Sequence, residues 1–234
     1  MLRKSIFVLL IVLFLSIGLL ASVAKSKPDN SSSVETSSLV ETVQKENPKV
    51  AIDKLEEKSK LDPWVAHNCH YPLHDIGRSA YKKYGDLNES WSYMNNFCVG
   101  GYIHGNLLEY FESRETIPEK FDMCSKFEHE SRNLYSCSHG TGNGLIMFTG
   151  NDLNKSIELC ESKLDTNFQE QGCADGVYVQ HFRKVNSNYN YPEEAFETCS
   201  KNKAKFKKQC YEYVSFNFHE KDTSDLLEMT NGCM

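Results

Sequence analysis

The sequence predicts an all-α fold, an α-solenoid of helical hairpin repeats that are cross-linked by disulfides. One series of cysteines recurs at intervals of 39, 36 and 37 residues: Cys98, Cys137, Cys173 and Cys210. A second series follows each member by 26 or 23 residues: Cys124, Cys160, Cys199 and Cys233. Two interleaved series with one period indicate an internal repeat. A period of about 36–39 residues fits two helices and two turns, so each repeat is expected to be one helical hairpin.

Glycines support the same repeat. Small residues follow the first cysteine of three units, in CVGGYIHG, CSHGTGNG and CADGVYVQ, and place Gly101, Gly140 and Gly176 at one offset. Glycine costs about 1 kcal/mol in a helix interior. Its recurrence at a fixed offset therefore predicts a close approach between neighbouring helices. In the last complete unit, the second helix is expected from Tyr191 to Cys199.

Residues 1–24 are expected to be either a signal peptide or an N-terminal membrane anchor. Two positive charges precede the apolar run Ile6–Leu20, as in secretory segments. The residues SVA at 22–24 offer a cleavage site, whereas the apolar run is nearly long enough to span a bilayer uncleaved. Both alternatives place the rest of the chain outside the cytoplasm, secreted or anchored to the cell membrane.

Residues 25–61 are predicted to be a disordered extracytoplasmic tether. They contain no aromatic residue, glycine or cysteine and are rich in Ser, Glu, Lys and Val. Such a segment buries too little apolar area to offset its ordering entropy, although a short solvated helix at 50–60 is compatible with it. The composition changes at Asp62, so residues 62–234 are expected to form the cysteine-rich helical repeat domain.

The nine cysteines of an exported chain predict disulfides. The simplest pairing joins each second helix to the start of the next unit: Cys124 to Cys137, Cys160 to Cys173, and Cys199 to Cys210. Cys69, Cys98 and Cys233 are left without an assignment, and the odd number leaves one thiol free or bonded to another molecule. No two cysteines lie closer than eleven residues, which argues against CxxC zinc and redox motifs.

The period, the paired cysteines and segments such as EEAFETC resemble the cysteine-rich branch of exported tetratricopeptide-like helical repeats. The resemblance covers residues 98–233. It implies a binding or scaffolding role on a concave surface, and it supplies no catalytic residues.

Histidines give a competing signal. Asp62 and Pro63 predict the start of a helix that runs toward Tyr81 and is interrupted at Pro72. On that helix His70 and His74 are four residues apart and can share a metal ion.

Further ligands must come from other parts of the chain. His104 and His139 adjoin glycines at unit openings and are the candidate partners, with His67 and Cys69 as additional ligands. Imidazole with a free thiol suits copper or zinc. Asp62, Asp75 and Asp175 are carboxylates that can assist such a site.

Two functional hypotheses follow. The first is a non-enzymatic, membrane-associated binding or scaffold protein that recognises a protein, a glycan or an envelope component. The second is a metal-binding protein or metal-dependent enzyme centred on His70, His74, His104 and His139. The structural alternative is that these histidines are buried in the core and donate hydrogen bonds to backbone carbonyls. Cleavage after Ala24 would remove Arg3 and Lys4 and take the formal net charge from −6 to −8, which disfavours nucleic acid as a partner.

Overall fold

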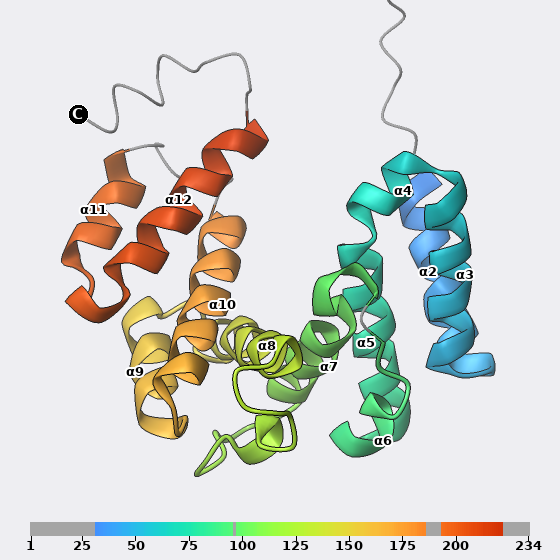
Figure 1. The fold of residues 1–234 in the computed structure, drawn as a ribbon, viewed down its shortest axis with the longest axis horizontal. Coiled ribbons are helices and arrows are strands. Elements are labelled where there is room, and N and C mark those ends of the chain that lie inside the picture. The colour runs from blue at the N-terminus through green and yellow to red at the C-terminus, as the bar shows by residue number, and fades with distance from the viewer. Residues whose placement is uncertain (1–30, 96, 186–192, 222–234) are drawn as a thin grey trace, which may run out of the picture. The chain divides into compact units, whose positions relative to one another are not determined.

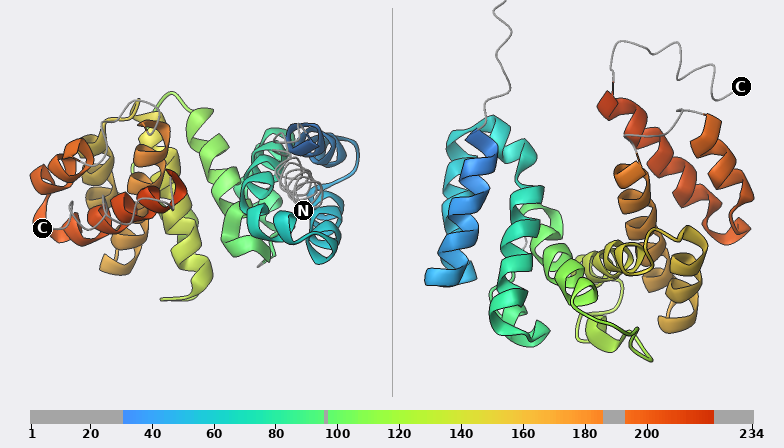
Figure 2. Two further views of the ribbon diagram at one scale, coloured as in Figure 1. Left: turned by 90° about the horizontal axis from the view of Figure 1, so that it is seen from above. Right: turned by 180° about the vertical axis from the view of Figure 1, so that it is seen from behind.

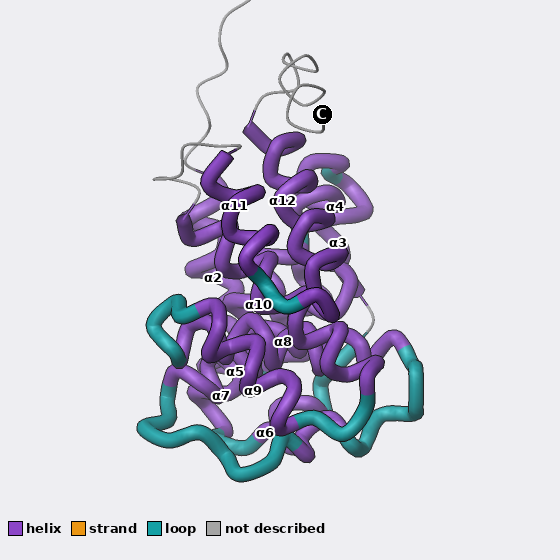
Figure 3. Tube along the Cα trace, turned by 90° about the vertical axis from the view of Figure 1, so that its left-hand side faces the viewer, coloured by secondary structure: helices purple, strands orange, loops and turns teal. Residues whose placement is uncertain are grey.

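The computed structural model describes residues 31–95, 97–185 and 193–221. Within these ranges the chain forms eleven α-helices, three short 3-10 helices and no strand, which confirms the all-α prediction (Figure 3). The α-helices are α2 (Ser31–Lys45), α3 (Pro48–Leu61), α4 (Pro63–Asn68), α5 (His70–Tyr84), α6 (Leu87–Trp91), α7 (Gly101–Glu112), α8 (Arg132–Phe148), α9 (Leu153–Lys163), α10 (Asn167–Val185), α11 (Glu193–Lys201) and α12 (Lys207–Lys221).

The chain divides into two units, Met1–Glu35 and Thr36–Met234, and the contacts described below lie within the second. None of the helices in the described ranges is long and apolar enough to cross a membrane. Residues 1–24, where a signal peptide or anchor is expected, lie outside those ranges.

The predicted tether is the largest correction to the domain boundaries. Residues 31–61 form α2 and α3, so the prediction of disorder is wrong for this part of 25–61. Leu39 and Val43 of α2 and Ile52 and Leu55 of α3 are buried in one hydrophobic cluster with the apolar face of α5. Composition does not indicate these helices. A few apolar residues at helical spacing are enough to give a helix one face that packs in the core.

The junction of α4 and α5 differs from the predicted kink at Pro72. Asp62 caps α4 as expected, and its carboxylate accepts a hydrogen bond from Trp64 N at 2.8 Å. The interruption lies at Cys69, and α5 begins at His70. Pro72 is then the third residue of α5, where a helix has no intrahelical partner for the missing N–H.

Five helices form the core of the unit, and each packs on the next. α5 packs on α7, α7 on α8, α8 on α10, and α10 on α12 (Figures 1 and 2). α9 packs against α8 and α10, and α11 packs against α12. Phe111, Phe182 and Phe206 are fully buried in the largest apolar cluster, whose buried residues lie between Phe111 and Val214. The predicted second helix near Tyr191–Cys199 corresponds to α11 over the described residues.

Glycines hold these helices close together, as the sequence predicted. A Cβ built on Gly101 would lie 2.6 Å from the carbonyl oxygen of His70, and one on Gly140 would lie 3.1 Å from the Cα of His104. At Gly176 the same atom would overlap the carbonyl oxygen of His139. Each of the three glycines therefore lies against the preceding helix of the packing series.

The three predicted disulfides are present: Cys124–Cys137, Cys160–Cys173 and Cys199–Cys210. A fourth bond joins Cys69 to Cys98. Cys69 was a possible additional ligand only as a free thiol, and this bond removes it from the candidate ligands. Cys233, the ninth cysteine, lies outside the described residues.

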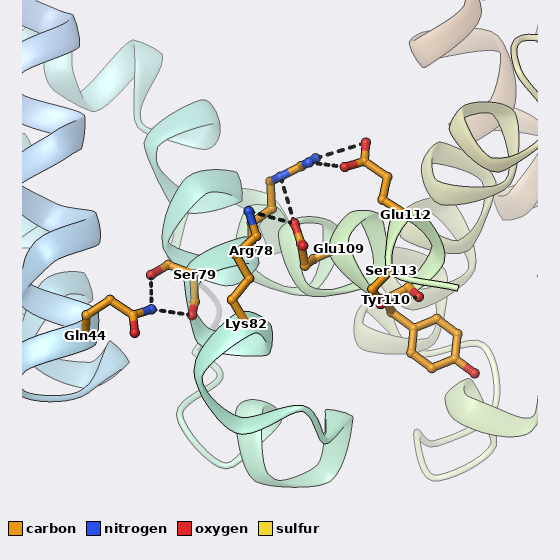
Figure 4. A network of polar contacts seen from close by, with 8 residues as sticks. All are labelled: Gln44, Arg78, Ser79, Lys82, Glu109, Tyr110, Glu112 and Ser113. Carbon is orange, nitrogen blue, oxygen red and sulfur yellow. Dashed lines mark hydrogen bonds and ion pairs between the residues drawn. The ribbon is translucent and has the colours of Figure 1, made fainter. Parts of the chain in front are cut away.

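Polar side chains also join α2, α5 and α7 (Figure 4). Gln44 Nε2 of α2 donates hydrogen bonds to the carbonyl and hydroxyl oxygens of Ser79, at 2.9 and 2.8 Å. Arg78 of α5 forms ion pairs with Glu109 and Glu112 of α7. Because Glu109 is only 12% exposed, this contact fixes the position of α7 relative to α5 more firmly than a surface ion pair would.

Candidate metal centre

His70 and His74 lie on one face of α5, four residues apart. Side chains at this spacing point to the same side of a helix. The two Nε2 atoms are 3.0 Å apart, and the ring centroids are 4.6 Å apart. The sequence-predicted pair is therefore formed.

His104 reaches the same place from α7. A Cβ on Gly105, the residue after His104, would overlap the carbonyl oxygen of His74, so α7 crosses α5 at close range at this point. One donor nitrogen from each of His70, His74 and His104 lies within 4.8 Å of the others. Tetrahedral coordination with metal–nitrogen bonds of 2.0–2.1 Å separates the donors by roughly 3.4 Å. The 3.0 Å between the Nε2 atoms of His70 and His74 and the 4.8 Å limit for the three donors bracket this spacing.

The orientation of His70 is fixed by the backbone of the neighbouring segment. Its Nδ1 lies 3.0 Å from the carbonyl oxygen of Cys98. An Nδ1–H that donates to this oxygen leaves the lone pair on Nε2, the atom facing His74. A hydrogen bond of this kind selects the tautomer and ring orientation of metal-binding histidines.

The same segment carries unusual backbone angles. Cys98 and Val99 have φ values of 49° and 54°, and Gly100 follows at 74°. A positive φ is strained for a β-branched residue such as Val99. The Cys69–Cys98 disulfide ties this strained turn to the residue that precedes His70.

The electrostatic environment keeps the three imidazoles neutral. Burial lowers the pKa of His70, and it lowers the pKa values of His74 and His104 well below the ordinary range. Repulsion from neighbouring imidazolium forms lowers the pKa values of His74 and His104 further, whereas the hydrogen bond to the Cys98 carbonyl partly offsets the effect of burial on the pKa of His70. The neutral imidazole is the form that binds metal ions, so protons do not compete with a metal at this site near neutral pH.

His104 differs from an ordinary core histidine. It is 5% exposed, yet neither ring nitrogen makes a hydrogen bond of good geometry within the described residues, and the Ser136 backbone contributes only the smallest of the effects on its pKa. An unpaired buried polar group costs about 1–3 kcal/mol. His181 provides the contrast, because it is also buried but its Nδ1 lies 3.1 Å from Asn151 Oδ1.

The other predicted ligands do not join this three-residue group. The ring of His139 stacks on that of His104 with centroids 4.8 Å apart, and its Nδ1 has no partner in the described part of the chain. Burial lowers the pKa of His139 to about 3. His67 is exposed on α4, and Cys69 is in a disulfide.

No carboxylate belongs to the three-residue group within the described ranges. Asp75, beside His74, is partly buried, and that burial raises its pKa. Asp62 is the cap of α4. The candidate donor set therefore consists of three imidazoles, those of His70, His74 and His104. The other predicted ligands, His139, His67 and Cys69, do not belong to it.

A second polar cluster follows His139. Tyr135 Oη donates a hydrogen bond to Asp175 Oδ2 at 2.8 Å, and burial raises the pKa of Asp175 to about 6. The rings of Tyr135 and Tyr213 lie 6.0 and 6.5 Å from that of His139. The sequence holds a signal for this placement, since Asp175 follows Cys173 by two residues, as His139 follows Cys137.

No family model, curated protein or solved structure matches this chain.

Proposed function

We propose that this protein binds a copper or zinc ion through His70, His74 and His104. The observation that carries the proposal is the convergence of three neutral imidazoles from two helices, with donor atoms within 4.8 Å of one another. Imidazole nitrogen is a preferred ligand of both metals. A bound ion would also satisfy one of the two buried ring nitrogens of His104.

Three protein ligands leave at least one coordination position for water or an exogenous ligand. This coordination is typical of catalytic zinc sites, whereas structural sites use four protein ligands. His70 is the more exposed of the three histidines, so the open position is expected on its side. His139 supports the cluster by stacking on His104. We therefore favour a site that exchanges ligands over a closed structural site.

We further propose that this site is displayed outside the cytoplasm on an α-solenoid of helical hairpins similar to cysteine-rich tetratricopeptide-like repeats. The four disulfides favour an oxidising compartment. The apolar run of residues 6–20 supports export or membrane anchoring.

The alternative of a binding scaffold for a protein, glycan or envelope component is favoured by one observation. Four large apolar side chains are exposed around the α3–α5 junction and its disulfide: Leu61, Trp64, Tyr71 and Val99. Exposed apolar groups that lie together mark interaction surfaces more often than isolated ones do.

Metal analysis tests the proposal directly. The native protein, with intact disulfides and no polyhistidine tag, is expected to retain about one equivalent of copper or zinc after dialysis, and a His70→Ala/His74→Ala variant to retain almost none. A His67→Ala/His129→Ala variant is the matched control, because both residues are exposed. A native protein that is folded yet takes up neither metal would contradict the proposal.

The Cys69–Cys98 disulfide is expected to set the metal affinity. A Cys69→Ser/Cys98→Ser variant frees the strained turn whose carbonyl holds His70, and loss of such a supporting contact weakens metal binding roughly 10- to 100-fold. Competition with a chromophoric chelator measures the change. The control is Cys199→Ser/Cys210→Ser, which removes a disulfide between α11 and α12. Equal affinities for the two variants would exclude a specific role for Cys69–Cys98.

A further inference from the structure

The crossing of α8 and α10 places potential metal ligands where the crossing of α5 and α7 places the three histidines. At each crossing, a glycine of either helix lies against a backbone carbonyl of the other: Gly77 and Gly105 at the first, Gly142 and Gly176 at the second. The site histidines lie seven, three and one positions before their glycines: His70, His74 and His104. The same positions at the second crossing hold Tyr135, His139 and Asp175. The backbone of the first site is thus repeated with different side chains.

These side chains are in contact with one another. Tyr135 Oη donates a hydrogen bond to Asp175 Oδ2 at 2.8 Å, and the Tyr135 ring lies 6.0 Å from that of His139. Tyr213 of α12 adds a second phenol, with its ring 6.5 Å from that of His139. Burial and the neighbouring charges of Asp175 and Tyr213 raise the pKa of Tyr135, so the two phenols are close enough to interact. One imidazole, one carboxylate and two phenols therefore surround one place.

His139 has an unused donor atom at this place. It is 9% exposed, and its Nδ1 has no partner within the described part of the chain. Stacking on His104 covers a face of the ring and leaves the ring nitrogens at its edge. Buried polar atoms are rarely left unpaired in native proteins, so an unpaired one points to a ligand that completes it.

Asp175 lacks a charge partner. Burial raises its pKa to about 6, so the carboxylate is ionised at neutral pH. The Lys208 ammonium lowers this pKa, but it lies 3.6 Å from Glu212 as an ion pair, and Glu212 raises the pKa of Asp175. No lysine or arginine of the described residues forms an ion pair with Asp175. A carboxylate partly removed from water is stabilised by a cation.

We propose that Tyr135, His139, Asp175 and Tyr213 bind a ferric ion at a site separate from the three histidines. The inference goes beyond the proposed copper or zinc site, because the two sites share no ligand. When iron binds, each phenol releases its proton to solvent and its oxygen bonds to the metal. Two phenolates and one carboxylate then carry three negative charges, which balance the charge of Fe³⁺.

The donor atoms favour iron over other metals. Copper and zinc bind well to imidazole and thiolate, whereas oxygen donors suit harder ions. Magnesium and calcium also prefer oxygen, but they take ligands from carboxylates, carbonyls and water and not from imidazole. Histidine and carboxylate together bind non-haem iron, and tyrosine is the axial ligand of iron in some haem proteins. Phenol, carboxylate and imidazole in one group therefore match ferric iron best.

Titration of the full-length protein with ferric nitrilotriacetate tests this assignment. Phenolate bound to Fe³⁺ gives a charge-transfer band in the visible region, which imidazole and carboxylate ligands do not produce. The native protein is expected to develop this band and to saturate at about one equivalent. Tyr135→Phe is expected to lose most of the band and to bind iron at least roughly 10-fold more weakly, because loss of a ligand costs more than loss of a supporting contact.

Two further variants remove ligands from other helices. Tyr213→Phe and Asp175→Asn change α12 and α10, and both are expected to weaken iron binding like Tyr135→Phe. They keep the test decisive if Tyr135→Phe does not fold, which thermal melting of each variant shows.

Tyr71→Phe is the matched control, because Tyr71 also lies beside histidines. Its ring is 5.7 Å from that of His70 and 5.9 Å from that of His74. Phenylalanine keeps the ring on which Arg183 stacks and removes only the hydroxyl. This variant is expected to give the native band.

The outcomes locate the iron or exclude it. A folded native protein without a phenolate band overturns the proposal, and so does a band of native intensity and affinity in folded Tyr135→Phe and Tyr213→Phe. Loss of the band in Tyr71→Phe would place the iron at the three histidines and would overturn the separate site. Retention of copper or zinc by the native protein is measured independently, so either site can fail without the other.

Discussion

Replacing Gly142 with alanine is expected to destabilise the fold by at least about 3 kcal/mol or to prevent folding. Gly142 lies in α8 where this helix crosses α10, and a Cβ there would overlap the carbonyl oxygen of Cys173. The oxygen belongs to the backbone, so no change of rotamer relieves the overlap. The two helices must separate along an interface that buries Val177 and Leu145.

Urea unfolding followed by circular dichroism measures this effect. Gly172→Ala is the control at the same crossing, because its Cβ would come no closer than 3.1 Å to Ser138 Cβ and 3.4 Å to Cδ2 and the carbonyl oxygen of Tyr135, which small shifts can accommodate. These neighbours can adjust, and alanine favours the helix. The control is expected to lie within about 1 kcal/mol of the native protein. A Gly142→Ala variant as stable as the control would show that the helices are not held at this distance.

The crossing of α8 and α10 repeats the crossing of α5 and α7. Gly142 opposes the carbonyl of Cys173, and Gly176 opposes that of His139. In the earlier pair, Gly77 opposes the carbonyl of Tyr102, and Gly105 opposes that of His74. In each of these four helices, the glycine lies three positions after the residue whose carbonyl faces the glycine of the partner helix. The packing that brings the histidines together is therefore a repeated backbone arrangement.

The sequence predicted those features that are encoded locally or periodically. Three disulfides were found because their cysteines recur 11 or 13 residues apart within a regular series. The fourth was missed because Cys69 stands outside that series and pairs across 29 residues. The packing of 31–61 into the core was missed because a segment without aromatic residues resembles a disordered one, although a short solvated helix at 50–60 was allowed.

The histidine site was predicted in part for the same reason. His70 and His74 share a helix face, which spacing alone shows. His104 was included among the candidate ligands because it adjoins a glycine, and in the structure it lies beside His70 and His74. His139 adjoins an equivalent glycine, but its ring stacks on His104 without joining the three donors. The contact between Arg183 and Tyr71, which joins α10 to α5, could not be predicted because no sequence spacing specifies it.

Replacing His104 with leucine is expected to stabilise the metal-free protein by about 1 kcal/mol or more and to abolish stabilisation by metal. The side chain is buried and its ring nitrogens have no partner in the described residues. Leucine has a similar volume and no polar atoms that require a partner. A histidine kept only for packing would give the opposite sign, because its replacement would remove contacts without a compensating gain.

His181→Leu supplies the comparison. His181 is 7% exposed, and its Nδ1 contacts Asn151 Oδ1. Leucine at this position leaves Asn151 without that partner, so this variant is expected to be less stable than the native protein by about 1–3 kcal/mol. The two substitutions are chemically identical and differ in whether the histidine already has a partner. Their opposite effects would identify His104 as a residue retained for binding.

Thermal unfolding with and without metal completes the experiment. A ligand that binds only the folded state stabilises it by about 4 kcal/mol at a concentration of a thousand times its dissociation constant. The native protein and His181→Leu are expected to gain this stability with zinc or copper, whereas His104→Leu is expected to gain almost none. If His104→Leu is destabilised as much as His181→Leu, and zinc and copper leave the native melting temperature unchanged, then His104 is a core residue. In the expected case, His104 lowers the free energy of unfolding of the metal-free protein, and metal binding raises it again. Metal binding and folding are then thermodynamically linked at this site.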